Sequence, residues 1–505
     1  MEVEQLQISP TAMESGIRDA PALSAAAVTG WTFDLIAQLT LKSKDFKKKD
    51  EDAADKCREA LRRVFNFMLD GKGGVASQWV ASRLVCLGKP DGGIRPIAIG
   101  ETFYRLMARI AAHSASRRSG ESLAPFQYGV GISGGAEIIT HTMRMVESFL
   151  TARDSGQHHF ESEDASDPTC ALLVDYRNAF NELKRGAIFE GVCELCPYLL
   201  KVFRWGYGGK SPLYLGNGTV VCHSGTGVRQ GDPLGPLFFA VGIQSMVQQL
   251  HRKFPAIHGL FYLDDGTLVG PRSALSAAFR WLEVEGDKIG LKANRAKTVL
   301  WDTTSQAATF ENIKVERSGV KLLGGPLGGD LEVALEGVDA SRGFVETFVA
   351  THLKKRAESL DALAHIPTNT AFILLRACIN ARPGYLMRSL PPWVTRDSAI
   401  DFDSAVDGCL AKLALWQGPL PELAKAIRGL PLAYAGLATR RMELCRECAY
   451  AASFLSAAYH IQRNHQWIWE LCTTDQSFLL TREVALLKQQ GGAGDAEGRG
   501  GPRRQ

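Results

Sequence analysis

The stretch from residue 261 to residue 269 constrains the fold of this chain most, because two adjacent carboxylates interrupt a run of apolar residues. It reads Phe-Tyr-Leu-Asp-Asp-Gly-Thr-Leu-Val, with Asp264 and Asp265 in the middle. Asp-Gly between two apolar runs is a strong short-range signal for a β-hairpin, because a tight type I′ turn needs positive φ angles. The sequence therefore predicts a hairpin that turns at Asp265-Gly266 and carries both carboxylates at its tip.

Two neighbouring carboxylates repel each other unless a cation lies between them. Hard divalent cations such as Mg²⁺ prefer carboxylate oxygens and keep coordination positions for phosphate oxygens. A purely structural Asp-Gly turn needs only one acidic residue. Taken alone, this stretch leaves two interpretations open, a metal site for phosphoryl chemistry and an ordinary hairpin.

A third carboxylate follows another apolar run. Asp175 comes directly after residues 171–174, Ala-Leu-Leu-Val, which predict a buried strand. A carboxylate at the end of a buried strand is costly unless it is paired or bound to a metal. Two metal ions held by such a cluster can activate an attacking hydroxyl group and stabilise a leaving pyrophosphate. Asp175, Asp264 and Asp265 are therefore the candidate catalytic residues and metal ligands.

Composition narrows the class of protein around this cluster. The 505 residues are 45% hydrophobic, enough for large cores, and the net charge of +4 does not by itself indicate nucleic acid. Eleven scattered cysteines fit reduced thiols in an intracellular protein. The first residues lack a signal-peptide pattern, and no apolar run reaches about 18 residues, so we predict no membrane span.

Hydrophobic periodicity predicts the other elements. Residues 1–29 should form a loose arm and residues 42–55 a solvated loop, with nucleic-acid contact as the alternative for its lysines. Residues 81–87 and 94–99 predict a hairpin with a Gly-rich tip, and Asp232 is expected to cap the helix that follows it. Helices are expected over residues 31–41, 57–68, 101–116, 135–150, 234–254 and 274–289, and over most of 331–415 and 430–471. A further helix is expected to end near residue 205.

Several motifs then follow one another in a recognisable order. Three segments resemble motifs A, B and C of reverse transcriptases: Asp175-x-x-x-Ala179-Phe180, Gln230-Gly231-Asp232-Pro233-Leu234 and Tyr262-Leu263-Asp264-Asp265. Residues 82–97, 290–298 and 323–328 resemble the matching segments of non-LTR (LINE-type) retrotransposon reverse transcriptases. Any one motif is moderately specific, whereas the ordered series is very specific.

The resemblance implies an α+β fold, the right-hand polymerase, with an antiparallel palm sheet and a C-terminal helical region. It implies RNA-directed DNA synthesis with two Mg²⁺ ions (Mn²⁺ as a substitute), an RNA template, a DNA primer or target DNA, and dNTPs. A nuclear location follows from the DNA that such an element must reach. The expected ranges are 1–45 for an N-terminal arm and first helix, 46–170 for the fingers, 171–330 for the palm with motifs A to E, 331–480 for a helical thumb and C-terminal region, and 481–505 for a disordered tail.

The resemblance also implies roles for single residues. Asp175 and Asp264 would bind both metal ions, with Asp265 as the less direct third carboxylate. Phe180 matches the steric gate, an aromatic face where a ribose 2′-hydroxyl would lie. Lys297 matches a position that protonates pyrophosphate, with a strand-edge lysine as the alternative. The remaining matches are Lys89 and Arg95 for the triphosphate, Gln230 for the incoming nucleotide and template, and Leu323, Gly324 and Gly325 for the primer grip.

Other interpretations stay open at this point. Without a visible endonuclease pattern, the chain is expected to be a truncated or decayed copy or to depend on an endonuclease from another chain. A catalytically inactive, retroelement-derived RNA-binding protein and an RNA-dependent RNA polymerase are the alternatives to the reverse transcriptase. Cys445 and Cys448, followed by His460 and His465, approach a zinc-finger spacing, but the Ala-rich helical periodicity of residues 442–459 favours a helix.

Overall fold

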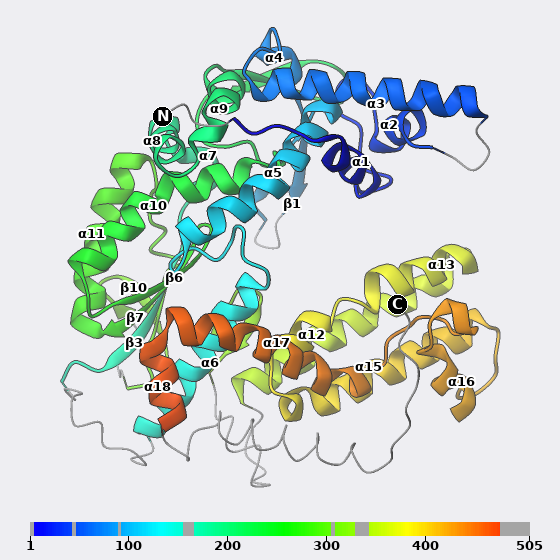
Figure 1. The fold of residues 1–505 in the computed structure, drawn as a ribbon. Helices are drawn as coiled ribbons and strands as arrows, with labels where there is room; N and C mark the ends of the chain where they lie inside the picture. Colours follow the sequence, from blue (N-terminus) through cyan, green and yellow to red (C-terminus); the bar gives the residue numbers. More distant parts are fainter. Residues whose placement is uncertain are drawn as a thin grey trace. The chain divides into compact units, whose positions relative to one another are not determined.

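The computed structural model describes residues 5–42, 47–88, 92–154, 166–304, 309–328 and 343–474 (Figure 1). The predicted tail, residues 481–505, lies outside these ranges. The chain forms two compact units, each assembled from several chain segments. Unit 1 comprises Met1–Ser133, Ala171–Thr298 and Glu311–Ile313, and unit 2 comprises Gly134–Cys170, Val299–Phe310 and Lys314–Gln505.

Unit 1 begins with a helix where the sequence predicted a loose arm. α1 (Pro10–Arg18) is capped by Ser9, whose Oγ accepts a hydrogen bond from the Ala12 N–H at 3.1 Å. Met13 and Ile17 lie one turn apart on the same face and are both buried. The prediction was wrong because two apolar residues in nine give too weak a periodicity to detect.

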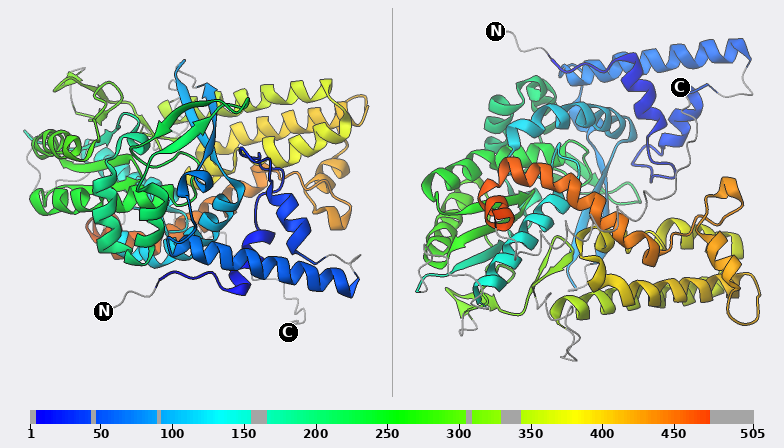
Figure 2. Two further views of the ribbon diagram at one scale, coloured as in Figure 1. Left: turned by 90° about the horizontal axis from the view of Figure 1, so that it is seen from above. Right: turned by 60° about the horizontal axis from the view of Figure 1, so that its bottom comes forward.

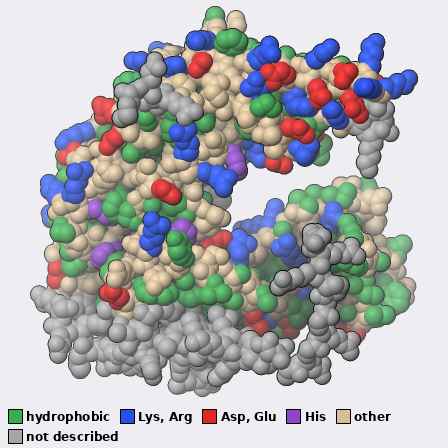
Figure 3. Space-filling view, viewed as in Figure 1, with side chains coloured by type: hydrophobic (Ala, Val, Ile, Leu, Met, Phe, Trp, Pro, Cys, Tyr) green, Lys and Arg blue, Asp and Glu red, His purple; other side chains and the backbone are tan. Residues whose placement is uncertain are grey.

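The predicted solvated loop over residues 42–55 is also wrong, from residue 48 onward. α2 (Phe33–Thr40) is followed by α3 (Lys48–Leu69), a continuous helix. Its charged residues pair along the helix, as in the ion pair between Arg58 and Asp55 at 2.5 Å, while Phe65 and Met68 are buried. Lys, Arg, Asp and Glu side chains mix along α3 in Figure 3, which is typical of a solvated helix face.

A four-stranded sheet follows in unit 1. β1 (Ser82–Gly88) and β2 (Ile94–Gly100) form the predicted antiparallel hairpin, with Ser82 opposite Gly100. β4 (Ser211–Tyr214) and β5 (Val220–Ser224) complete the order β2-β1-β4-β5. The helix expected to end near residue 205 is broken into α7 (Ala179–Glu182), α8 (Arg185–Leu195) and α9 (Leu200–Tyr207), and Pro197 accounts for the break between α8 and α9.

Three strands of unit 1 carry the candidate carboxylates. They are adjacent in the order β6-β7-β3, with bounds His258–Tyr262, Asp265–Pro271 and Thr169–Val174. α11 (Arg272–Ile289) packs on β7, and α10 (Gly235–Lys253) packs against α5 (Thr102–Leu123), α8 and α11. The first half of α10 is buried and forms part of the apolar core of unit 1.

Unit 2 is mainly helical. α6 (Gly135–Asp154) packs against α14 (Gly384–Ser389), α17 (Met442–Asn464), α18 (Gln466–Thr474) and the hairpin strand β12 (Gly325–Leu327), and Figure 2 shows α17 alongside α6. The other helices are α12 (Phe344–Asp361), α13 (Thr368–Leu374), α15 (Pro392–Leu413) and α16 (Glu422–Arg428). The strands are β8 (Val299–Trp301), β9 (Thr309–Phe310), β10 (Ile313–Glu316), β11 (Val320–Leu322) and β12.

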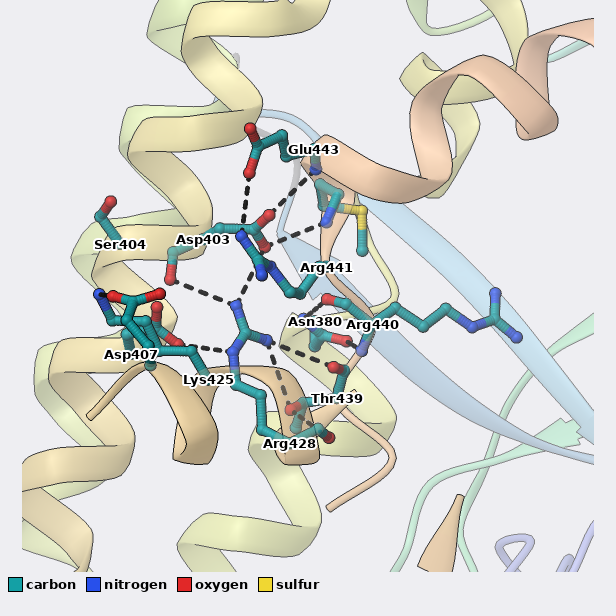
Figure 4. A network of polar contacts seen from close by, with 12 residues as sticks. Asn380, Asp403, Ser404, Asp407, Lys425, Arg428, Thr439, Arg440, Arg441 and Glu443 are labelled. Atoms are coloured by element: carbon teal, nitrogen blue, oxygen red, sulfur yellow. Dashed lines mark hydrogen bonds and ion pairs between the residues drawn. The ribbon is translucent and has the colours of Figure 1, made fainter. Parts of the chain in front are cut away.

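A buried polar network joins α15, α16 and α17 (Figure 4). Arg428, at the end of α16, pairs with Asp403 at 3.3 Å and with Asp407 at 2.5 Å, both on α15. The Asp403 carboxylate also accepts the N–H groups of Met442 and Glu443 at 3.0 Å each, which caps α17. The network satisfies charges that would be costly to bury unpaired.

The fold class predicted from the sequence is confirmed. Helices and mostly antiparallel strands mix in one chain, and helices dominate the described residues from 343 onward, as predicted for the right-hand polymerase fold and its C-terminal helical region. Among the described helices, none combines the length and the apolarity that crossing a membrane would require.

Candidate active site

The hairpin of the two carboxylates is present, but its turn lies two residues earlier than predicted. Tyr262 pairs with Asp265, so Leu263 and Asp264 form the turn, and Leu263 has a φ of 57°. Gly266 lies inside the strand pairing, opposite Phe261. A Cβ at Gly266 would lie 2.9 Å from Cε1 of the Phe261 ring, so the glycine is needed for packing and not for the turn.

Asp175 is held by hydrogen bonds from the segment that follows α11. Nδ2 of Asn294 donates a hydrogen bond to Oδ2 of Asp175 at 2.8 Å, and the Asn294 N–H donates to the Asp175 carbonyl at 2.8 Å. The Asp175 N–H in turn donates to Oγ1 of Thr298 at 3.2 Å. Asn294 therefore orients a candidate metal ligand, a role that the sequence analysis did not assign to it.

The pKa values of Asp264 and Asp265 are both raised. Burial, followed by the charge of Asp175, raises the pKa of Asp264, and the Arg95 charge opposes this rise. Although Asp265 reaches solvent, partial burial of its carboxyl and the charges of Asp264 and Asp175 raise its pKa to about 6. The structure therefore brings the predicted carboxylates together, with Arg95 within electrostatic range.

This environment fits a divalent cation. Partly buried carboxylates that repel one another are stabilised when a cation lies between them. Within the described ranges, no group of three or more His, Cys, Asp and Glu side chains is placed so that it could hold a metal ion as it stands, and this includes the three carboxylates. The donors are thus the oxygens that Mg²⁺ prefers, and their side chains would have to turn toward the ion.

Phe180 lies beside this cluster in sequence, at the start of α7. Its ring stacks on Phe239 of α10 with a centroid distance of 4.5 Å and an angle of 5° between the planes. Phe239 is fully buried. The Phe180 carbonyl accepts the Val228 N–H at 2.7 Å, which joins motif A to the motif B loop. Phe180, the predicted gate residue, is therefore held by contacts of both its ring and its backbone.

The motif B loop is anchored by a buried network that the sequence did not reveal. Oδ2 of Asp232 accepts hydrogen bonds from the Tyr104 hydroxyl at 2.7 Å, the Tyr207 hydroxyl at 2.6 Å and Nη2 of Arg229 at 3.0 Å. Oδ1 accepts the Leu234 N–H at 3.0 Å. The predicted helix cap at Asp232 is wrong, because α10 begins at Gly235 and the carboxylate serves this ion pair.

Gln230 lies on this loop, next to strand β2. Its carbonyl accepts the Ala98 N–H at 2.8 Å, and Gly231 adopts a φ of 117°. A Cβ at Gly231 would lie 2.5 Å from the Ala98 carbonyl oxygen, so only glycine fits there. Oε1 of Gln230 is buried and has no hydrogen-bond partner among the described residues, so this amide has an unused acceptor.

The other predicted site residues fall in three places. Lys89 lies outside the described residues. Lys297 lies in the turn after Asn294 and is exposed, and its role stays a prediction. Leu323 and Gly324, with φ angles of 45° and 89°, form the turn between β11 and β12 in unit 2.

This turn in unit 2, the predicted primer grip, is held by α6. Glu147 Oε1 accepts the Gly328 N–H at 2.8 Å, and Arg144 donates to the Pro326 carbonyl. Arg144 and Glu147 are both buried and pair with each other at 2.7 Å. The tight Gly-rich turn exists, and its function as a primer grip stays a prediction.

The helical interpretation of the Cys-rich segment is confirmed. Cys445, Cys448 and His460 all lie on the continuous helix α17. Twelve helical residues separate the last two by about 18 Å, too far for one zinc ion. His465 follows the helix and is buried.

Known proteins are similar to this chain at several levels. The family model of the reverse transcriptase (RNA-dependent DNA polymerase) matches residues 87–327. Over 440 residues, the chain is 27% identical to the retrotransposable element SLACS 132 kDa protein of Trypanosoma brucei gambiense. This match covers 85% of the chain but 33% of that protein, so the chain spans about a third of its relative.

Two solved structures show a weaker likeness. Apo telomerase from Candida tropicalis shares 10% identity and a TM-score of 0.37, covering 77% of this chain and 69% of that one. Telomerase from Candida albicans with a TWJ fragment of telomeric RNA shares 12% identity and a TM-score of 0.32, covering 71% and 63%. The family match, the SLACS relative and the ordered motifs around the carboxylates agree: residues 87–327 match the reverse transcriptase family, and the chain as a whole is similar to a retrotransposon protein.

Proposed function

We propose that this chain copies an RNA template into DNA by adding dNTPs to a DNA primer or target DNA, with two Mg²⁺ ions or Mn²⁺ in their place. The observation that carries the proposal is the placement of Asp175, Asp264 and Asp265 at one end of adjacent strands, where the charge of Asp175 acts on the other two. Reverse transcriptase domains use divalent ions, and this is where the chain offers oxygen ligands for them.

The residues around the cluster support the individual steps. Asp175 and Asp264 would hold both ions, with Asp265 as the third ligand. Divalent ions held by these residues would supply activation of a primer hydroxyl and neutralisation of the leaving pyrophosphate. Asn294 keeps one Asp175 oxygen engaged, so the carboxylate keeps a fixed direction. Lys297 would then donate a proton to the leaving group.

Substrate selection would come from residues of the same unit. Arg95 would contact the triphosphate together with Lys89, and its charge already acts on Asp264. Phe180, held flat against Phe239, would exclude a ribose 2′-hydroxyl. Gln230 would contact the incoming nucleotide or the template.

The larger assignments belong to the same proposal. Residues 46–170 would act as fingers, 171–330 as palm and 331–480 as thumb and C-terminal region, with the primer held at the turn of Leu323, Gly324 and Gly325. An endonuclease on another chain would supply cut target DNA. Work on chromosomal DNA would place the protein in the nucleus.

The test is primer extension on an RNA template with the Asp264→Asn variant. Burial disfavours the charged form of Asp264, so an uncharged amide of the same shape should fold normally. We expect dNTP incorporation to fall by several orders of magnitude. Asp287→Asn, an exposed acid on α11 in the same unit, is the matched control and should keep full activity.

Undiminished incorporation by Asp264→Asn would refute the assignment of the active site. A wild-type protein that retains RNA but extends no primer would favour the inactive RNA-binding alternative. Equal use of rNTPs and dNTPs would favour an RNA polymerase.

A further inference from the structure

Gln127 lies on the segment between α5 and α6, and its side chain faces the catalytic turn. It is fully buried, and its amide makes both kinds of hydrogen bond to one residue. Oε1 accepts the Leu263 N–H at 2.7 Å, and Nε2 donates to the Leu263 carbonyl at 3.3 Å. Oε1 also accepts the Gly129 N–H at 3.0 Å, so the side-chain oxygen accepts from both of the backbones that it joins.

The backbone around Gln127 is itself hydrogen-bonded to β6. Residues 126–128 run parallel to β6, with Gln127 bridged to Phe261. The Phe261 N–H donates to the Phe126 carbonyl and the Tyr128 N–H donates to the Phe261 carbonyl, each at 2.8 Å. This segment is therefore fixed to the catalytic hairpin before the side chain makes any contact.

The turn needs such support. Leu263 has a φ of 57°, a left-handed conformation that an L-residue with a large side chain adopts only when its surroundings enforce it. Asp264 follows immediately, so the direction of its carboxylate depends on the peptide that Gln127 holds. Gly129 closes on the same turn, and a Cβ there would lie 2.6 Å from Cγ and 2.8 Å from N of Leu263.

We propose that Gln127 is a positioning residue that locks the Leu263-Asp264 turn and so presents the Asp264 carboxylate to divalent cations. The role rests on the proposed metal-dependent function of that carboxylate. Glutamine is suited to it because one side chain must supply an acceptor and a donor to the same backbone residue. An apolar side chain of equal length supplies neither, and asparagine is one methylene too short.

A structural role alone would make a different prediction. A buried amide that only stabilises the fold lowers the melting temperature when it is replaced, but it does not change the metal requirement of the folded protein. Asn380 in unit 2 is the matched control. It is also buried, with Nδ2 donating to the Arg440 carbonyl at 2.9 Å and Oδ1 accepting the Arg440 N–H at 2.7 Å (Figure 4).

The experiment measures Mn²⁺ binding to the folded full chain by titration calorimetry, together with the Mg²⁺ concentration for half-maximal primer extension. We expect Gln127→Met to bind Mn²⁺ about 10- to 100-fold more weakly and to need correspondingly more Mg²⁺. Gly129→Ala, which pushes the same turn from outside, should shift both readouts in the same direction. Asn380→Leu should lower the melting temperature and leave both unchanged.

Wild-type Mn²⁺ affinity in both Gln127→Met and Gly129→Ala would overturn the proposal, as would an equal loss of affinity in Asn380→Leu. If wild-type protein extends no primer, the proposed polymerase function is refuted. If Gln127→Met nevertheless binds Mn²⁺ more weakly than that wild-type protein, the positioning role is supported. If folded wild-type protein bound no Mn²⁺ at all, both the proposed polymerase function and the positioning role of Gln127 would be refuted.

Discussion

The surroundings of Phe180 allow a specific prediction of how its replacement changes the choice between dNTPs and rNTPs. Its ring lies flat against Phe239, which has no exposed surface, so the ring cannot swing away from a nucleotide sugar. We expect Phe180→Ala to lower the preference for dNTPs over rNTPs by about 100-fold, because a steric contact and not a lost hydrogen bond sets the selectivity. The measurement is single-nucleotide extension with matched dNTP and rNTP.

The control for that substitution is Phe279→Leu, a fully buried aromatic residue on α11. It should lower stability by a comparable or larger amount without changing the selectivity. An unchanged dNTP preference in Phe180→Ala would mean that another side chain faces the 2′-position.

At the scale of single residues, the sequence predicted those site residues that differ chemically from their immediate neighbours in the chain. Asp175, Asp264 and Asp265 stand beside apolar runs, and that contrast is visible in any window of nine residues. The partners of these groups are not visible in this way. Gln127 contacts a residue 136 positions away and Asn294 one 119 positions away, so no local pattern could have paired them.

At the scale of the elements, the contact between α6 and α17 makes the free energy of unfolding depend on pH. His141 of α6 is fully buried, with Nε2 at 3.0 Å from the Ser453 hydroxyl and its ring against Tyr450 and Phe454. Burial, reinforced by the Arg144 charge, lowers the pKa of His141 to about 3. The folded state therefore holds the neutral ring.

The sign of the effect follows from this lowered pKa. The unfolded chain takes up a proton at about pH 6.5 and the folded chain does not, so the stability that neutral His141 confers is complete above about pH 6.5. It is lost as the pH falls toward 3, by about 1.4 kcal/mol per pH unit.

Urea unfolding at pH 7 and at pH 5 tests this dependence. Wild-type protein should lose about 2 kcal/mol more unfolding free energy between the two values than His141→Gln, which cannot titrate. Equal losses in the two proteins would show that His141 is accessible to protons in the folded state.

Element boundaries were predictable where one physical signal dominated. The hairpin of β1 and β2 has a Gly-rich tip between apolar runs, and its strands were placed to within a residue or two. α3 was missed at its start because residues 48–55 are lysines and acids with only two alanines among them, which resembles a solvated loop. The ion pairs one helical turn apart, such as Arg58 with Asp55, begin only at the end of this stretch. The hairpin at Asp264 was found, but its turn was misplaced because Gly266 serves packing.

At the scale of the whole molecule, the family match and the compact units do not coincide. The match ends at residue 327, whereas α6, inside it, belongs to unit 2 and packs against α14, α17 and α18. No local pattern in the sequence indicates this interleaving. Burial of the α6 face depends on helices that lie far beyond the matched range.

A truncation series tests this dependence. A fragment that ends at residue 328 should expose the apolar face of α6, which includes Met143, Val146 and Leu150, and should therefore aggregate or bind ANS strongly. A fragment that ends at residue 474 keeps the covering helices and should stay soluble, with cooperative unfolding. A soluble, cooperatively unfolding fragment 1–328 would contradict the expected role of the C-terminal helices.

The same packing has a consequence for synthesis on the ribosome. α6 leaves the exit tunnel long before its partner, because α17 begins about 290 residues later, a delay of roughly 15 to 60 seconds at about 5–20 residues per second. Throughout that interval the nascent chain carries an uncovered apolar helix next to half-built strands. We expect chaperones that bind apolar segments to bind such a nascent chain. A copy whose reading frame breaks before α17 would still contain α6, but its apolar face would stay uncovered.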